Sequence, residues 1–263
     1  MKRRKLIRYG IDSVFAAVGF GLWHKLGQPA SAQTTASALS IQWLGHMCFL
    51  FTGNGKRLLV NPFDTIGCTA GYPEPSVTVD YVMLSSKMRD EGYPFNLPGN
   101  PELLTTSGIY PIGNGLEIEG VLSDHDLLNG ERFGTNIMWR WVQSGVRIAH
   151  LGGAAAPITD EQLILIRRPD VLLLPVGGGP KAYNPLQARD AIARLNPKVV
   201  IPTQYRTSAA DEQSCDLVGV EAFVALMEDV PVQRLEGDTL ALTPGNLPQA
   251  GMQIVIFNWE RES

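Results

Sequence analysis

The chain has 263 residues, of which 44% are hydrophobic and 18% charged, so it can bury a core as one large domain or two small ones. Its formal net charge is −4, and this becomes −9 when residues 1–32, with six basic residues and one acidic residue, are left out. So acidic a protein has no electrostatic reason to bind a phosphate backbone or anionic lipid, and we expect no nucleic-acid partner.

The first 32 residues differ in composition from the rest of the chain. Five basic residues lie within the first eight, followed by a modest apolar run over Val14–Leu22 and by Ala30-Ser31-Ala32. This order is typical of an export signal, and Arg3-Arg4 with the residues that follow resembles the twin-arginine motif. We therefore predict an export signal over residues 1–32, a linker over 33–40, and a mature protein in the periplasm or an equivalent extracytoplasmic lumen.

Two alternatives for this segment are a short uncleaved membrane anchor and a cytosolic basic tail. The apolar run is shorter than the roughly 20 residues that a bilayer requires. Asp12, His24 and Lys25 also lie close around it. We therefore expect no stable membrane span after removal of the signal.

The three cysteines are too few and too scattered for a disulfide framework. Cys48 lies between Met47 and Phe49 in an apolar run, which is typical of a buried small hydrophobic residue. A single bridge between Cys68 and Cys215 is allowed in an oxidising compartment, but the sequence does not require it.

Three β-like runs open the domain that we predict over residues 41–258, and turns at Gly45-His46 and Gly53–Gly55 separate them. This pattern predicts a meander of antiparallel strands. The strands predicted in the first half are Ile41–Leu44, Met47–Thr52, Arg57–Asn61, Tyr81–Leu84, Glu102–Thr105, Leu116–Leu122, Gly134–Val142 and Val146–His150.

The pattern changes after Gly152 to an alternation of helices and strands. Thr159 with Gln162 three residues later predicts a capping box that opens a helix ending near Arg167. The elements predicted after it are a strand over 170–176, a helix over 184–195, a strand over 198–202, a helix over 220–229, and strands over 232–235, 239–243 and 253–257. Strands followed by such an alternation indicate a layered α/β protein.

The stretch Asp80–Gly92 is the predicted functional centre. Its first half is a buried strand, and its second half is a polar loop at the carboxyl end of that strand, where α/β proteins place their chemistry. Other blocks of the chain accompany it in a fixed order: Trp43–His46, Asn61–Phe63, Leu84–Glu91, Ser123–Asp126, His150–Gly153, Pro175–Gly178 and Ile201–Tyr205.

The order and spacing of these blocks resemble the metallo-β-lactamase-fold hydrolases, especially the branch similar to ascorbate-6-phosphate lactonase. The resemblance covers residues 39–257 and implies an αββα sandwich. In that family a His-x-His-x-Asp-His loop and three later residues (His, bridging Asp and His) hold one or two metal ions. The residues at these positions are Ser86, Met88, Asp90, Glu91, His125, Gly153 and Gln204.

Only Asp90 and His125 match the ligands that the resemblance implies. Hydroxyl and amide side chains are poor zinc ligands, a thioether suits copper(I), and Gly153 has no side chain. We therefore predict a protein without a cofactor that is not a catalyst and that binds a small polar molecule or a protein partner in the remnant cleft formed by those seven residues. The alternative is a hydrolase of a lactone, ester or phosphoester that holds one divalent metal ion at Asp90, Glu91 and His125, so whether the chain is an enzyme stays open.

Structural roles compete with these functional ones. Hydrogen bonds that hold two loops together are favoured over a residual metal site as the role of Asp90 and His125. We interpret His46 and His150 as hydrogen-bonded structural histidines beside turns. Ser85 or Ser86 with His125 lacks the Gly-x-Ser-x-Gly turn of a nucleophilic serine. Gly177–Gly179 is interpreted as a tight turn near the pocket because it lacks the pattern of a phosphate-binding loop.

Overall fold

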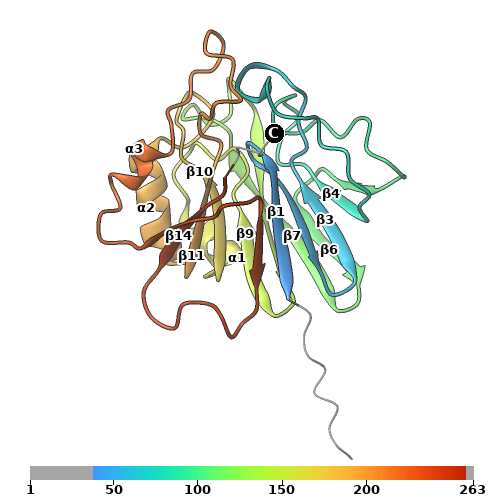
Figure 1. Cartoon of the computed structure of the whole chain (residues 1–263). Helices are drawn as coiled ribbons and strands as arrows, with labels where there is room; N and C mark the ends of the chain where they lie inside the picture. The colour runs from blue at the N-terminus through green and yellow to red at the C-terminus, as the bar shows by residue number, and fades with distance from the viewer. Residues whose placement is uncertain (1–37, 259–263) are drawn as a thin grey trace, which may run out of the picture. The chain divides into compact units, whose positions relative to one another are not determined.

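Two β-sheets that face each other form the frame of the protein (Figure 1). This computed structural model describes residues 38–258, which lie within the unit Ala36–Ser263. The predicted export signal and most of the predicted linker lie outside the described residues. The two sheets and the mixture of helices and strands agree with the expected fold class.

The first sheet contains six strands in the order β13-β1-β2-β3-β4-β5. Their bounds are β1 Leu39–Gly45, β2 Cys48–Gly53, β3 Lys56–Val60, β4 Tyr81–Met83, β5 Glu102–Leu104 and β13 Thr239–Leu242. Strands β1, β2 and β3 pair antiparallel, which confirms the predicted meander, whereas β4 and β5 continue parallel to β3.

The second sheet contains eight strands in the order β12-β14-β11-β10-β9-β8-β7-β6. Their bounds are β6 Gly108–Gly113, β7 Leu116–Asp124, β8 Thr135–Gln143, β9 Val146–His150, β10 Val171–Pro175, β11 Val199–Thr203, β12 Val232–Arg234 and β14 Gln253–Ile256. Strand β6 was not predicted. It contains Pro111 and lies at the sheet edge, where a residue without an N–H is tolerated.

The helices are α1 Asp160–Ile166, α2 Pro185–Leu195, α3 Glu221–Val224 and the 3-10 turn η1 Gly67–Thr69. The predicted capping box of Thr159 and Gln162 is present, and Asn184 with Gln187 forms a second one on α2. Helix α1 packs on β7 and β8, and α2 contacts α3. The helix predicted over 220–229 is only four residues long, and the chain continues after it in turns closed by i to i+3 hydrogen bonds such as Met227 N to Val224 O at 2.9 Å.

The core lies between the sheets and is rich in aromatic rings. Phe51 of β2 meets Trp141 of β8 edge to face, with ring centroids 4.8 Å apart. Phe49 contacts the ring of His150 on β9 at 6.1 Å. Aromatic pairs in this arrangement add about 0.5–1.5 kcal/mol beyond the burial of their area, so these contacts fix the stacking of the sheets.

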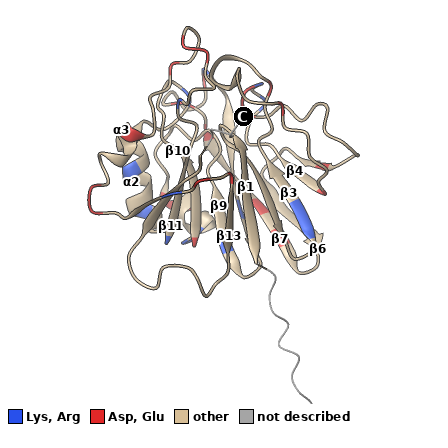
Figure 2. Cartoon of the chain, viewed as in Figure 1, with Lys and Arg blue, Asp and Glu red and all other residues tan. Residues whose placement is uncertain are grey.

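The sheets present the carboxyl ends of their parallel strands at one edge. Strand β4 pairs parallel with β3, and β10 pairs parallel with both β9 and β11. The loops that follow these strands therefore gather at the same edge, where they carry the site. Figure 2 shows basic residues on separate elements, including α2, mixed with acidic ones. No helix in residues 38–258 is long and apolar enough to cross a membrane.

Candidate functional site

A buried carboxylate, Glu91, is the centre of the site. It lies in the loop after β4, and its side chain is 0% exposed. Its Oε2 accepts hydrogen bonds from His125 Nε2 at 2.6 Å and Ser86 Oγ at 3.1 Å. Its Oε1 accepts one from Gln204 Nε2 at 2.8 Å and lies 3.2 Å from Lys181 Nζ. Four loops therefore converge on one carboxylate.

Lys181 brings a positive charge to this carboxylate from the loop after β10. Its ammonium also pairs with Asp90 and lies 3.7 Å from Met88 Sδ. The sequence analysis did not single out Lys181. The signal that was available is its position directly after the Gly-Gly-Gly-Pro turn at the carboxyl end of a buried strand.

The charges of this cluster shift one another's pKa values. Burial raises the pKa of Glu91, but His125 and Lys181 outweigh burial and lower it to about 2. Burial lowers the pKa of His125, and Glu91 outweighs that effect and raises it above its ordinary value. Burial likewise lowers the pKa of Lys181, and Glu91 and Asp90 raise it overall. The three groups therefore stabilise one another in their charged forms.

Gly153 makes room for the contact between Glu91 and His125. A Cβ atom at this position would lie 2.6 Å from both Glu91 Oε2 and His125 Nε2, closer than carbon approaches such atoms. Gly153 N also donates to Asn136 Oδ1 at 2.9 Å, which fixes its backbone. The missing side chain is thus part of the arrangement, and the structure brings Gly153 together with Ser86, Glu91, His125 and Gln204.

Asp126 organises the loop that follows His125. Its carboxylate, 2% exposed by residue area, accepts backbone N–H groups from four residues of the loop. These donors are Leu128, Gly130, Arg132 and Phe133. Asp126 therefore shapes the loop, because its oxygens are engaged by the backbone.

The serines at this edge are held by other partners. Ser85 N donates to Asn61 Oδ1 at 2.7 Å, and Asn61 Nδ2 donates to Ser85 Oγ at 3.1 Å. Ser86 Oγ donates to Glu91, while His125 directs Nε2 at the same carboxylate. This geometry does not form a serine, histidine and aspartate triad.

The two other histidines of the described chain differ from each other. His150 Nδ1 accepts from Gly152 N at 3.0 Å and its Nε2 donates to Met47 O at 3.2 Å, which confirms a structural histidine. His46 is 1% exposed, and neither ring nitrogen has a hydrogen-bond partner within residues 38–258. The interpretation of His46 as a hydrogen-bonded structural residue is therefore wrong. Its φ of 52° places it in the left-handed region, as does the φ of 49° at Gln204.

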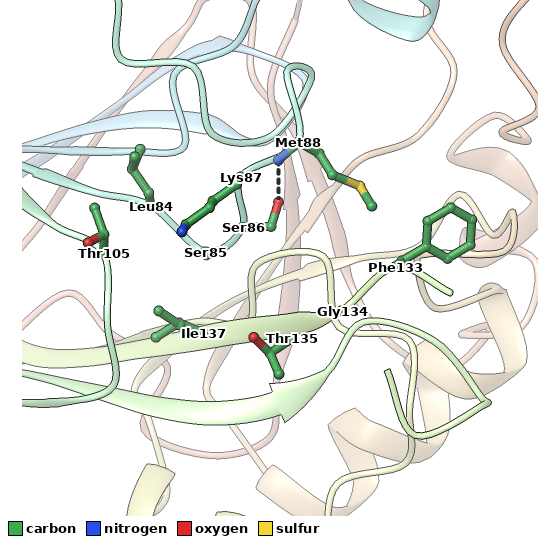
Figure 3. A pocket seen from close by; sticks show the side chains of 10 residues that line it. All are labelled: Leu84, Ser85, Ser86, Lys87, Met88, Thr105, Phe133, Gly134, Thr135 and Ile137. Carbon is green, nitrogen blue, oxygen red and sulfur yellow. Dashed lines mark hydrogen bonds between the residues drawn. The ribbon is translucent and has the colours of Figure 1, made fainter. Parts of the chain in front are cut away.

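Two cavities flank the loop that carries Glu91. One, of about 430 Å³, is lined by Ser86, Lys87 and Met88 on one side and by Thr135 and Ile137 of β8 on the other (Figure 3). The second, of about 380 Å³, has His46, Cys68, Asp90, Lys181, Gln204 and Asp216 among its lining residues. His46 and Gln204, two of the residues that line the second cavity, carry buried polar atoms without a partner in the described chain, which favours this cavity as a ligand site.

A disulfide joins two loops that border the second cavity. Cys68 is bonded to Cys215, across a sequence separation of 147 residues. Both ends lie beside lining residues, with Gly67 on one loop and Asp216 on the other. The sequence left this pair open, and the structure forms it, whereas Cys48 is buried and free as predicted.

The paired sheets and the loop cluster at their common edge define the metallo-β-lactamase class of protein. The family described as Beta-lactamase superfamily domain matches residues 40–204, and the chain belongs to this family. The branch similar to ascorbate-6-phosphate lactonase stays a prediction.

Relatives of known sequence and structure support this membership. A protein of Thermoplasma acidophilum named as a metal-dependent hydrolase is 27% identical over 193 residues, which cover 64% of this chain and 84% of that protein. A solved structure from Thermotoga maritima, described as a candidate zinc-dependent hydrolase of the metallo-β-lactamase superfamily, is 30% identical with a TM-score of 0.67. It covers 83% of this chain and 98% of its own. An isothiocyanate hydrolase from Delia radicum gut bacteria, 13% identical with a TM-score of 0.60 over 78% of this chain and 99% of its own, shares the fold.

These names correct one prediction of the sequence analysis. The expectation of no cofactor is contradicted, because several relatives are named metal-dependent hydrolases and so point to a divalent metal ion. The residues at the family's ligand positions do not fit such an ion by themselves. Among residues 38–258, no three His, Cys, Asp or Glu side chains are grouped as metal ligands, and the Lys181 ammonium already pairs with the carboxylates of Asp90 and Glu91. Asp90, Glu91 and His125 therefore do not form a three-ligand group.

Proposed function

We propose that this protein is a non-catalytic member of its family that binds a small polar molecule in the 380 Å³ cavity. The observation that carries the proposal is the His46 ring, which lines this cavity with two buried nitrogens that have no partner in residues 38–258. A buried polar group without a partner costs about 1–3 kcal/mol, so a ligand that bonds to it removes a penalty. Non-catalytic status is supported by the engagement of Glu91 with His125, Gln204 and Lys181.

A second candidate is a metal-dependent hydrolase, the class that the relatives' names give, with a lactone, ester or phosphoester as its substrate on the basis of the sequence resemblance alone. One experiment separates the two. We expect thermal-shift measurements on a panel of small polar compounds to find binders whose effect disappears in His46→Asn, since a ligand of the native state raises its melting temperature. Asn keeps the left-handed backbone that His46 requires and removes the ring.

The control for catalysis uses the same preparations. We expect no hydrolysis of nitrophenyl esters, lactones or phosphoesters above the buffer rate, with or without added zinc, manganese or iron(II). Hydrolysis that follows the added metal and is lost in Glu91→Gln would contradict the binding proposal and support the hydrolase.

We further propose that the protein is exported through a twin-arginine route. The sequence of residues 1–32 supports this, and the Cys68–Cys215 disulfide is the kind of bond that persists in an oxidising compartment. Changing Arg3 and Arg4 to Lys is expected to leave the protein in the cytoplasm, as measured by cell fractionation. The matched control is Arg8→Lys, which lies outside the arginine pair and is expected to be exported normally. Unchanged export of the double variant would exclude the twin-arginine route.

A further inference from the structure

The second cavity offers free hydrogen-bond acceptors. The amide of Gln204 is oriented by its Nε2, which donates to Glu91 Oε1 at 2.8 Å. Its Oε1 is left as an acceptor that is buried and without a partner among residues 38–258. Gln204 lines the cavity, so this oxygen is the acceptor that the residue can offer to a ligand bound there.

His46 adds a second acceptor. Burial lowers its pKa to about 4, although Asp90 and Glu91 raise it in part, so the ring is neutral near pH 7. A neutral imidazole has one N–H and one bare nitrogen that accepts a hydrogen bond. His46 O also accepts a long hydrogen bond of 3.4 Å from Gln204 N, so the two residues are neighbours on the cavity wall.

Lys181 lines the cavity, but its donors are already used. An ammonium has three N–H groups, and Lys181 Nζ has three contacts, with Asp90, Glu91 and Met88. Its charge is matched by two carboxylates, one of which is completely buried. Lys181 therefore supplies no free positive charge for an anionic ligand.

Asp216 provides a negative charge at the cavity mouth. It is exposed, and within the described residues its carboxylate makes no hydrogen bond or ion pair. Its oxygens lie 3.3 Å from the position that a Cβ on Gly179 would occupy, so it sits against the glycine turn after β10. The cavity thus combines free acceptors on its wall with an unpaired carboxylate at its edge.

We propose that this cavity selects small molecules that carry a protonated primary amine. The ammonium donates to Gln204 Oε1 and to the bare ring nitrogen of His46, and its charge faces Asp216. The inference rests on the proposed binding function and adds the chemical class of the ligand. An anion can accept a hydrogen bond only from the N–H of His46. An ammonium can interact with Gln204 Oε1, the bare nitrogen of His46 and the Asp216 carboxylate, which have no other partner in the described chain.

Titration calorimetry on the full chain tests the amine. The probes are 1,4-diaminobutane and ethanolamine, compared with the uncharged 1,4-butanediol and the anionic succinate. We expect both amines to bind at least about tenfold more tightly than the diol and the dicarboxylate, which corresponds to one hydrogen bond to a charged group.

Two variants locate the binding. Asp216→Asn is expected to weaken amine binding about tenfold, and because Asp216 is exposed the variant is expected to fold. Glu212→Gln is the matched control, since Glu212 is exposed on the same loop and does not line the cavity. His46→Asn is expected to weaken the amines as well.

The outcomes separate this inference from the proposed function. Amine preference that is lost in Asp216→Asn and kept in Glu212→Gln supports the inference. If the diol or succinate binds as tightly as the amines and His46→Asn weakens it, the cavity binds ligands but the amine class is wrong. If no compound of the wider panel binds, both proposals fail.

Discussion

Replacing Cys68 and Cys215 with serine is expected to lower the free energy of unfolding by about 3–5 kcal/mol. The bond closes a loop with a sequence separation of 147 residues. In the chain-entropy account a loop of this length is worth about 5 kcal/mol, and measured values are usually somewhat smaller. The two loops are also joined by backbone hydrogen bonds, such as Asp211 N to Gly67 O at 3.0 Å.

Urea unfolding followed by circular dichroism measures this loss. A reductant should destabilise the wild type to the level of the double variant and leave the variant itself unchanged. Because Cys68 lines the second cavity, ligand binding should weaken in the same samples. A variant with wild-type stability would mean that Cys68 and Cys215 are not bonded in the native protein.

Glu91→Gln is expected to destabilise the protein by about 3–5 kcal/mol. Removing one partner from a buried charge pair leaves the other charge buried without compensation, and this destabilises the folded state. Here the change affects His125 at 2.6 Å and the Lys181 ammonium at 3.2 Å. Glu117→Gln is the matched control, because Glu117 is exposed on β7 and should change stability by less than about 0.5 kcal/mol.

The pH dependence of this loss identifies its source. The pKa of Glu91 is lowered from 4.5 to about 2, so its contribution is present above pH 4.5 and is lost as the pH falls toward 2. The pKa of His125 is raised above 6.5, so its contribution is complete below pH 6.5 and is lost as the pH rises through the raised value. The difference between wild type and Glu91→Gln should therefore be largest between pH 4.5 and 6.5. A difference that does not vary from pH 2 to 9 would show that packing, and not charge, stabilises the cluster.

The sequence predicted most of the fold because the strands carry strong local signals. The continuous apolar run of β10 predicts a buried strand, and Thr159 with Gln162 predicts the start of α1, and both elements form as predicted. Strand β6 was missed because Pro111 and two glycines interrupt the alternation of apolar and polar residues, and its edge position explains how they are tolerated. The length of α3 was overestimated because hydrophobic spacing does not distinguish an α-helix from the turns with i to i+3 hydrogen bonds that follow it.

The sequence indicated where several residues of the site lie, but not the contacts that they make. Seven positions were selected by resemblance, and five of them, including Glu91 and Gly153, meet at one point. Asp90 and Met88 instead face Lys181, which the sequence analysis had not identified. Lys181 was missed and His46 was misinterpreted because their surroundings depend on contacts between loops more than 40 residues apart, which no local spacing reveals.

The packing around Gly153 limits which substitutions this position accepts, and in what order. A side chain there would collide with Glu91 Oε2 and His125 Nε2, each 2.6 Å from the new carbon. An aspartate, the residue that the resemblance places at this position, therefore requires both Glu91 and His125 to leave this space. Gly153→Asp by itself must displace both Glu91 and His125, whereas the same change made after Glu91 has been replaced must displace only His125. The packing at this glycine therefore makes the effect of a substitution depend on which neighbouring residue was changed before it.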